Sequence, residues 1–171
     1  MKKSFLLITL FAAFAGNVFA QNSLSWEQDG MRCSINLYTG DFSITVYDNE
    51  RNAFTVYGPN YNFEVFVVNG SISYRNDGKI GNVGSTSISY RSDGKVCSIG
   101  STSISYRYSD DKVCSIGSTS ISYRYSDDKV CSIGSTSISR RYSDDKICDV
   151  GSASISYDNS GKVSSIRGNV R

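Results

Sequence analysis

A tripeptide, Ser-Ile-Ser, recurs six times between residues 71 and 156 at nearly constant spacing. Successive copies lie 16 and 16, then 17, 17 and 17 residues apart. Each is followed by an aromatic or basic residue, a polar turn, a lysine and a second β-rich stretch. Tandem units of this kind are typical of repeat proteins, in which one unit cannot bury its apolar face alone. The central isoleucines are Ile72, Ile88, Ile104, Ile121, Ile138 and Ile155.

Each unit has the pattern of an antiparallel β-hairpin. Asp-Gly between two alternating stretches favours a type I′ turn, because both central residues of that turn need positive φ. A two-residue loop at Asp93-Gly94 places Tyr90 opposite Cys97, on the side that also carries the isoleucines. Arg91 and Val96 then fall on the opposite side. This alternation predicts a half-buried sheet.

The 17-residue units keep the same facing if a three-residue loop, 109–111, absorbs the extra residue. Tyr106 then lies opposite Cys114 on the buried face. Arg107 and Val113 lie on the other face, because side chains alternate along a strand. An extra residue that changes only the loop supports the hairpin interpretation.

Two less regular regions fit the same scheme. Residues 23–35 match 87–99 with seven identities in thirteen positions. Asn69-Gly70 predicts a turn that pairs Val65 with Tyr74 and Val67 with Ile72. A further turn at 49–51 predicts two more pairs, Ile44 with Val56 and Val46 with Phe54.

The predicted fold is all-β, with tandem antiparallel hairpins of 16–17 residues arranged radially or as a curled ribbon. Some fifteen strands exceed what an open sheet usually holds, so the sheet should curl. We expect about eight hairpins in a single domain over 21–171, with irregular copies in 21–70 and regular copies in 71–171.

The first twenty residues have the pattern of a secretory signal peptide. Lys2-Lys3 precede a largely apolar run, and the small residue Ala20 precedes the expected cleavage site before Gln21. The run is shorter than the roughly 20 apolar residues of a membrane-spanning helix. We therefore expect a secreted or periplasmic protein without a membrane span.

Charge and residue types exclude several functions. The chain has 18 basic and 16 acidic side chains, and residues 1–20 hold two of the lysines, so 16 of each remain after cleavage. A nucleic-acid surface normally shows a basic excess, so nucleic acid is not an expected partner. The absence of histidine excludes Ser-His-Asp triads and histidine-metal sites. We predict a non-enzyme without a cofactor.

All five cysteines occupy one position of the repeat, where other copies have Gly81 and Ser164. Equivalent strands of a meander lie roughly 9–10 Å apart, which is too far for a disulfide. No C-x-x-C spacing indicates a metal site. We expect free thiols that pack as small residues beside the aromatic, with disulfides or a metal as the alternatives. They are Cys33, Cys97, Cys114, Cys131 and Cys148.

Two other recurring groups have both a structural and a functional interpretation. Acidic pairs at the turns, such as Asp110-Asp111, invite a calcium site, but aspartate in a hairpin turn needs no metal. The aromatic column is either packing within the sheet or a stacking platform for sugars. Its members are Trp26, Tyr74, Tyr90, Tyr106, Tyr123 and Tyr157.

Recurring arginines form the candidate ligand surface. They are a solvated face in one interpretation and an array that meets an anionic or hydroxyl-rich polymer in the other. Arg140 interrupts the aromatic column on the inward face, which indicates an edge, a pore, a partner contact or a tolerated exception. The candidate residues are Arg91, Arg107, Arg124, Arg140 and Arg141.

The cadence Tyr-x-x-Asp-Gly-Lys-Val-x-x-Ile, which runs from Tyr90 to Ile99, resembles two families. One comprises the small secreted bacterial hairpin-repeat proteins described as β-flowers, and the other the YD (Rhs) repeats. The first resemblance implies hairpins that form petals around an axis and implies no assigned activity. The second implies a spiral of hairpins that builds a large shell. Chain length and the secretion signal favour the first.

Two classes of function follow. The leading hypothesis is a secreted, non-catalytic β-repeat scaffold that binds an unidentified ligand, with a glycan or an envelope component as the candidate partner. The alternative is a self-assembling structural protein that forms fibres or a surface layer.

Overall fold

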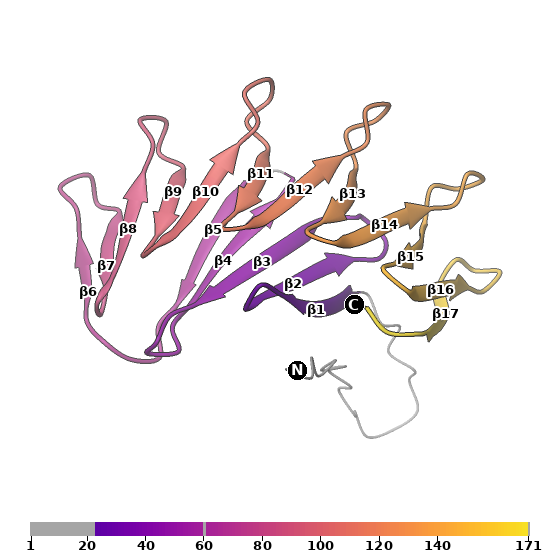
Figure 1. Cartoon of the computed structure of the whole chain (residues 1–171), viewed down its shortest axis with the longest axis horizontal. Coiled ribbons are helices and arrows are strands. Elements are labelled where there is room, and N and C mark those ends of the chain that lie inside the picture. The colour runs from indigo at the N-terminus through magenta and orange to yellow at the C-terminus, as the bar shows by residue number, and fades with distance from the viewer. Residues whose placement is uncertain (1–22, 60, 171) are drawn as a thin grey trace.

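The computed structural model describes residues 23–59 and 61–170, and every regular element in these ranges is a β-strand. The strands form two antiparallel sheets, one of five and one of twelve strands, and each sheet follows the order of the chain. The all-β fold of tandem hairpins is therefore confirmed, and Figure 1 shows the twelve-stranded sheet as a curved row of hairpins. The expected signal peptide and its cleavage site lie outside the described residues.

The N-terminal strands form the five-stranded sheet. Its members are five or six residues long, and in the first four strands burial alternates along most of the length. They are β1 (Ser23–Gln28), β2 (Met31–Asn36), β3 (Phe42–Tyr47), β4 (Ala53–Gly58) and β5 (Asn62–Phe66).

The other twelve strands make six hairpins, which we call the hairpin array. The array's strands are three to five residues long. They pair as β6 (Ile72–Tyr74) with β7 (Ile80–Val83), β8 (Thr86–Tyr90) with β9 (Val96–Ile99), β10 (Thr102–Tyr106) with β11 (Val113–Ile116), β12 (Thr119–Tyr123) with β13 (Val130–Ile133), β14 (Thr136–Arg140) with β15 (Ile147–Val150), and β16 (Ala153–Tyr157) with β17 (Val163–Arg167).

One hydrophobic core lies between the two sheets. The array curves along one face of the five-stranded sheet (Figure 1), and buried side chains from both form a single cluster. Phe42 and Phe54 are the largest fully buried side chains of the first sheet, and Ile116 and Ile133 are among those of the array. A single hairpin could not bury these residues alone, so the five-stranded sheet completes the core of every hairpin it covers.

A β-bulge in each hairpin of the array changes the expected register. Ile104 pairs with Ile116 as predicted, but Tyr106 pairs with Val113. The prediction that Cys114 faces Tyr106 and that Val113 lies on the outer face is therefore wrong. Val113 is fully buried. The same shift pairs Tyr90 with Val96 in place of Cys97.

The bulge has a hydrophobic cause. Val96 precedes Ile99 by three residues, so strict alternation would place these two apolar side chains on opposite faces. One extra residue in the strand turns both inward, and both are buried. Cys97 is that extra residue and stays half-exposed.

The loop at Asp93-Gly94 has three residues, and the prediction of a two-residue type I′ turn is wrong there. The Arg91 N–H donates to the Lys95 carbonyl at 2.8 Å, and the Gly94 N–H donates to the Arg91 carbonyl at 3.0 Å. Only Gly94 in this loop has a positive φ, of 90°. This geometry suits a type I turn followed by a glycine bulge.

The type I′ geometry does occur in the first hairpin. Asp29 and Gly30 between β1 and β2 have φ of 51° and 77°. Trp26 pairs with Cys33 in an uninterrupted register. The expected pairs around residues 49–51 are also confirmed, with Ile44 opposite Val56 and Val46 opposite Phe54.

The predicted hairpin at Asn69-Gly70 is wrong. Val65 pairs with Phe54, because β5 is the last strand of the five-stranded sheet. Tyr74 pairs with Ile80 in the first hairpin of the array. Asn69-Gly70 therefore lies where the chain passes from one sheet to the other.

Turns of the five-stranded sheet bind the array at intervals along its length. The Thr86 hydroxyl donates to Asp48 at 2.9 Å, and the Thr119 hydroxyl donates to Asp29 at 2.8 Å. At the opposite rim, the N–H of Val96 donates to the hydroxyl of Tyr61 at 2.9 Å. These polar contacts fix which hairpin lies over which strand.

Candidate functional site

Three tyrosines project from the tips of the 17-residue hairpins. Tyr108, Tyr125 and Tyr142 have relative exposures of 105%, 103% and 107%, so their side chains make almost no contact with the rest of the chain. Each occupies the first position of an equivalent loop. We call these three residues the tip tyrosines.

A four-residue loop holds each tip tyrosine. The Arg107 N–H donates to the Lys112 carbonyl at 2.8 Å, so the loop is 108–111 and not the three residues expected. Asp111 closes the loop in the left-handed region, with φ of 58°. Aspartate tolerates this conformation better than most non-glycine residues.

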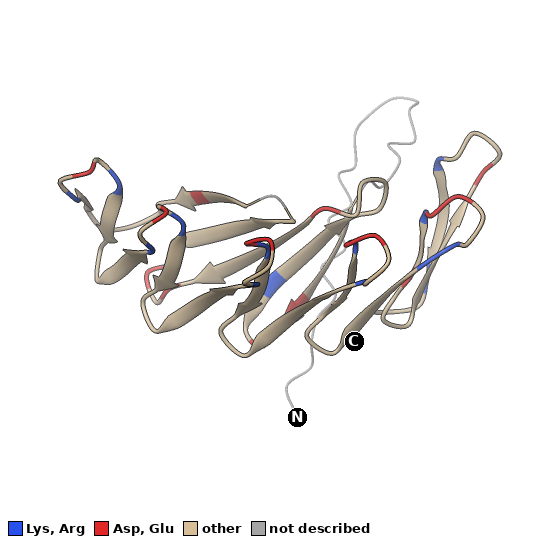
Figure 2. Ribbon diagram, turned by 90° about the horizontal axis from the view of Figure 1, so that it is seen from above, with Lys and Arg blue, Asp and Glu red and all other residues tan. Residues whose placement is uncertain are grey.

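The aspartate that closes each loop also binds the preceding hairpin. Asp128 accepts from Arg107 Nη2 at 2.7 Å and lies 3.1 Å from Lys112 Nζ. The equivalent Asp111 and Asp145 bind Arg91 and Arg124 at 3.1 and 2.7 Å. Figure 2 shows basic and acidic residues close together near the hairpin tips. A glycine at this position would relieve backbone strain, but it would remove the ion pair between hairpins.

A second aspartate stiffens each loop from within. Asp110 accepts from Arg107 Nε at 2.8 Å and from its Nη2. This hydrogen bonding holds the pKa of the Asp110 carboxyl well below its usual range. The equivalent bonds between Asp127 and Arg124 lower the pKa of Asp127 to about 2. The loop carboxylates are therefore ionised and paired at neutral pH.

Below the tips, a tyrosine side chain fills the space between successive hairpins. The hydroxyl of Tyr123 donates to the carbonyl of Val113 in the preceding hairpin at 2.7 Å. Arg107 and Lys112 of that hairpin lie over the Tyr123 ring, at 4.9 and 5.6 Å from its centroid. Burial raises the pKa of Tyr123 well above its usual range. The tyrosines of the aromatic column within the array thus connect successive hairpins. We call each such contact a joint, and its tyrosine a joint tyrosine.

Trp26 does not belong to that column. It lies on β1 in the five-stranded sheet and is buried there opposite Cys33. Tyr74, in the first hairpin of the array, is 65% exposed. The repeat pattern placed these residues correctly within their units but did not show that the units divide between two sheets.

Arg140 replaces a joint tyrosine in the fifth hairpin. Its side chain is 4% exposed, and its Nη1 donates to the Asp145 carbonyl at 3.0 Å. Nε and Nη2 are buried without a hydrogen-bond partner. Burial is the main cause that lowers the pKa of Arg140, and the charge of Arg124 adds to it. Its strand, β14, lies inside the array, so Arg140 does not mark a sheet edge.

Gly40 makes room for this arginine. A Cβ added at Gly40 would overlap the Arg140 guanidinium, and Gly40 has a φ of 77°. The loop between β2 and β3 therefore contacts the one hairpin in which arginine replaces the joint tyrosine. The structure explains how Arg140 is accommodated, and it gives no physical reason why arginine replaces tyrosine in this hairpin.

The structure brings four of the five predicted arginines to one rim, just below the tips. Arg91, Arg107 and Arg124 bind aspartates of the next hairpin, and Arg141 binds Asp144 of its own loop at 2.5 Å. Each of these arginines therefore has an acidic partner. A ligand surface made by these arginines stays a prediction.

The five cysteines differ between the sheets. Cys33 is fully buried, and burial raises the pKa of its thiol to about 12. The other four are half-buried on the bulged strands of the array, and all five thiols are free. In the described ranges no three acidic or thiol side chains lie together as a metal site.

Sequence analysis missed the tip tyrosines. The signal was present, because the residue that lengthens the unit from 16 to 17 is a tyrosine in every case. The 17-residue spacing predicts one extra residue in the loop, but a longer loop alone does not require an aromatic residue there. The sequence signal for these residues is therefore a polar turn that gains a tyrosine in three consecutive units.

Comparison with known proteins adds no relative. No family model, curated protein or solved structure matches the chain. Within residues 23–59 and 61–170, no helix is long and apolar enough to span a membrane.

Proposed function

We propose that this protein is a secreted, non-catalytic scaffold that binds an extended glycan across its hairpin tips. The tip tyrosines supply the contact area, and the ion pairs beneath them hold the tips in place. The observation that carries the proposal is the near-complete exposure of Tyr108, Tyr125 and Tyr142 at one equivalent position in consecutive repeats. A repeating ligand suits this arrangement, because each unit of the ligand can meet one tip.

Tyrosine is well suited to such contacts. Its ring offers a large, rigid apolar face at low entropic cost, and its hydroxyl can donate or accept a hydrogen bond. Several weak contacts on one ligand raise the overall affinity far above that of a single contact. Ser109 and its equivalents in the same loops add hydroxyl groups for a polar ligand.

Charge favours a hydroxyl-rich polymer over an anionic one. The arginines near the tips are paired with aspartates at 2.5–3.1 Å, so little uncompensated positive charge remains to attract an anion. Secretion is supported by the signal-peptide pattern of residues 1–20. The absence of histidine, and the pairing of the loop carboxylates with arginine, support a non-catalytic role.

Binding to insoluble polysaccharides tests the proposal. The purified chain is incubated with cellulose, chitin and peptidoglycan, and the bound fraction is measured over a range of concentrations. We expect at least one polymer to retain the protein, with affinity for its soluble oligomers rising with oligomer length. Replacing all three tip tyrosines by alanine should weaken this binding at least about tenfold.

Two control variants isolate the tip contribution. Replacing the three tyrosines by phenylalanine keeps the rings and should retain most of the affinity. Tyr47→Ala removes a tyrosine that is 48% exposed on β3, away from the tips, and should leave binding unchanged. Equal binding by the triple alanine variant and the unmodified chain, or no retention by any polymer, would contradict the proposal.

A further inference from the structure

Successive hairpins of the array meet through one repeated joint. At its base, two residue pairs join the strands, as Ser98 with Ser103 and Ile99 with Thr102. Above them the hydroxyl of Tyr106 donates to the carbonyl of Val96 at 2.6 Å. A lysine of the preceding hairpin lies over the tyrosine ring, in this case Lys95 at 5.4 Å from the centroid. Each joint therefore has a tyrosine side and a valine–lysine side.

The first hairpin of the array has the tyrosine side of a joint, and no strand of the described chain pairs with that edge. Tyr74 is 65% exposed, whereas Tyr90, Tyr106, Tyr123 and Tyr157 at the same position are half-buried. Ile72 is 40% exposed, whereas its equivalents in the five other hairpins are buried. The backbone groups of Ile72 and Tyr74 face the open edge of β6, because the carbonyl of Ser71 and the N–H of Arg75 bind toward β7.

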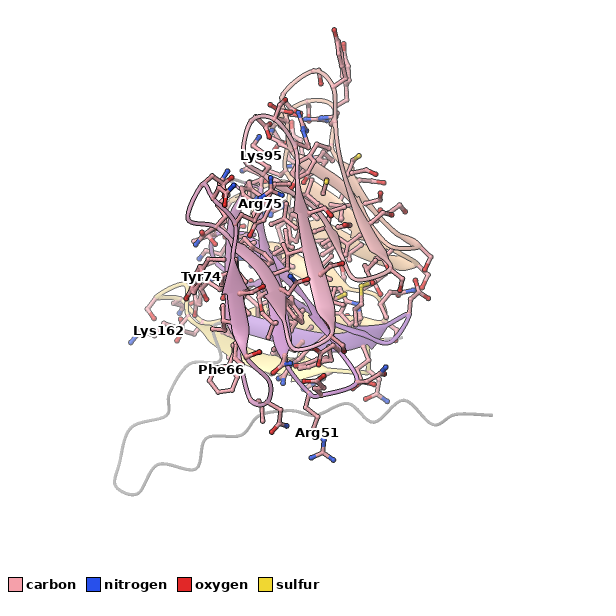
Figure 3. All side chains as sticks on the ribbon, turned by 90° about the vertical axis from the view of Figure 1, so that its left-hand side faces the viewer. Arg51, Phe66, Tyr74, Arg75, Lys95 and Lys162 are labelled. Atoms are coloured by element: carbon pink, nitrogen blue, oxygen red, sulfur yellow. The ribbon has the colours of Figure 1, made fainter. Side chains whose placement is uncertain are left out.

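The same end of the molecule carries further exposed apolar side chains. Phe66 on β5 is 70% exposed, and Val68, which follows that strand, is 52% exposed. Figure 3 shows Phe66 and Tyr74 on the end that faces the viewer. Together with Ile72, these side chains form an apolar surface beside an open strand edge, which is typical of an interaction site.

The last hairpin of the array has the valine–lysine side of a joint, and no strand of the described chain pairs with its outer edge. Lys162, Val163 and Ile166 occupy the positions of Lys95, Val96 and Ile99, and each is more exposed than its equivalent. The N–H of Val163 donates to the hydroxyl of Tyr38 at 3.1 Å, as the N–H of Val96 does to Tyr61. No tyrosine of the described chain follows to reach the carbonyl of Val163.

We propose that copies of this chain associate head to tail, with the β6 edge of one copy against the β17 edge of the next. The Tyr74 hydroxyl of one copy donates to the Val163 carbonyl of the other, and Lys162 lies over the Tyr74 ring. The contact repeats a joint that the chain already makes between its own hairpins. It is heterologous, so it propagates into a chain of copies or closes into a ring.

One difference makes this contact weaker than an internal joint. Asp158 stands in the last hairpin where the earlier hairpins have arginine, so the Tyr74 ring meets one cation in place of two. The contact also lacks the covalent turn that connects neighbouring hairpins. Association should therefore depend on protein concentration, because partners must meet from solution.

Sedimentation velocity on the purified chain tests the proposal. The weight-average mass should rise with concentration and pass beyond that of a dimer, because each copy has two different ends. Two variants each block one end. Tyr74→Ala removes the ring and its hydroxyl, and Lys162→Glu replaces the cation over the ring by an anion. Each should raise the dissociation constant about tenfold or more.

Mixing the two variants distinguishes this contact from other kinds of association. Each variant alone should stay monomeric at concentrations where the unmodified chain associates. A one-to-one mixture should form dimers and nothing larger, because one intact β6 edge and one intact β17 edge remain between them. Tyr108→Ala is the control, since it removes an exposed tyrosine away from both ends and should associate normally.

Three results would overturn the proposal. One is an unmodified chain that stays monomeric at its highest soluble concentration. Another is a Lys162→Glu variant that still dimerises alone, which would indicate a symmetric contact between two β6 edges. The third is loss of association in Tyr108→Ala. Circular dichroism of each variant confirms that it is folded, and the exposure of Tyr74 and Lys162 makes unfolding by these changes unexpected.

Discussion

The β1–β2 hairpin of the five-stranded sheet and the β8–β9 hairpin of the array have similar sequences and fold differently. Residues 23–35 and 87–99 share seven of thirteen residues, including Asp-Gly in the turn. The first copy has a two-residue turn and a continuous register, and the second has a three-residue loop and a bulge. The turn dipeptide therefore does not decide the hairpin geometry.

The two residues that follow the turn decide whether the hairpin has a bulge. The first copy continues Met31-Arg32, and the array copy continues Lys95-Val96. Met31 lies four residues before Ile35, so simple alternation buries both. Val96 lies three residues before Ile99, and only a bulge lets both point inward. The comparison teaches that the spacing of apolar residues sets the register, and that the turn adapts to it.

The largest expected effect tests whether the five-stranded sheet carries the common core. Phe54→Ala removes a fully buried ring from β4 and should lower the free energy of unfolding by about 3–5 kcal/mol. Phe66→Ala, on the neighbouring strand, removes a ring that is 70% exposed and should change it by less than about 0.5 kcal/mol. Urea unfolding of both variants gives the comparison. Similar losses would mean that the core does not lie between the sheets.

The next prediction tests the bulge. Val113→Thr keeps the side-chain shape but places a hydroxyl at a fully buried site, and it should cost about 1–3 kcal/mol. Cys114→Ser changes the half-exposed residue beside it and should cost less than about 1 kcal/mol. Thermal unfolding of the two variants ranks them. The opposite order would restore the simple alternation in which Cys114 faces the core.

The simple alternation could be predicted from sequence, and the bulge could not. The Ser-Ile-Ser spacing correctly predicted strands, hairpins and the pairing of Ile104 with Ile116. Cys and Val are both apolar, so the pattern Val-Cys-Ser-Ile did not show which of the two is buried. That choice depends on the second sheet, which fills the space beneath Val113, and a local pattern contains no information about it.

The repeat pattern also could not predict that the strands divide between two sheets. Asn69-Gly70 is a good turn dipeptide, yet it joins the two sheets, because β5 pairs with β4. The arginine positions were predicted, but their aspartate partners in the next hairpin were not, since those partners depend on how far the tips separate. The residues of a turn do not show how far apart neighbouring hairpin tips lie.

A smaller effect tests the joints between hairpins. Tyr123→Phe removes the donor to the Val113 carbonyl and should cost about 0.5–1.5 kcal/mol. Tyr125→Phe, two residues away, alters a hydroxyl on a side chain that is 103% exposed and should have no measurable effect. Paired thermal melts measure the contrast. Equal stability of the two variants would mean that the joint is held by packing alone.

The smallest expected effect is on the stability of the hairpin tips at low pH. Hydrogen bonding to Arg124 lowers the pKa of Asp127 to about 2, below its ordinary value of 3.8. The ionised carboxylate therefore stabilises the folded tip above about pH 4, and this contribution is lost as the pH falls toward 2. An NMR titration of the Asp127 carboxyl carbon should show the low midpoint. Arg124→Gln should move it up toward 3.8, and an unchanged midpoint would contradict the assigned pairing.

The polar contacts between the sheets also determine how many repeats the protein can carry. The hydroxyl of Tyr61 binds the N–H of Val96, and that of Tyr38 binds the N–H of Val163. These two fixed points lie four hairpins apart along the array. A chain that gained or lost one unit between them could satisfy only one of the two contacts. The near-identical hairpins look interchangeable, but the width of the sheet on which they lie sets their copy number.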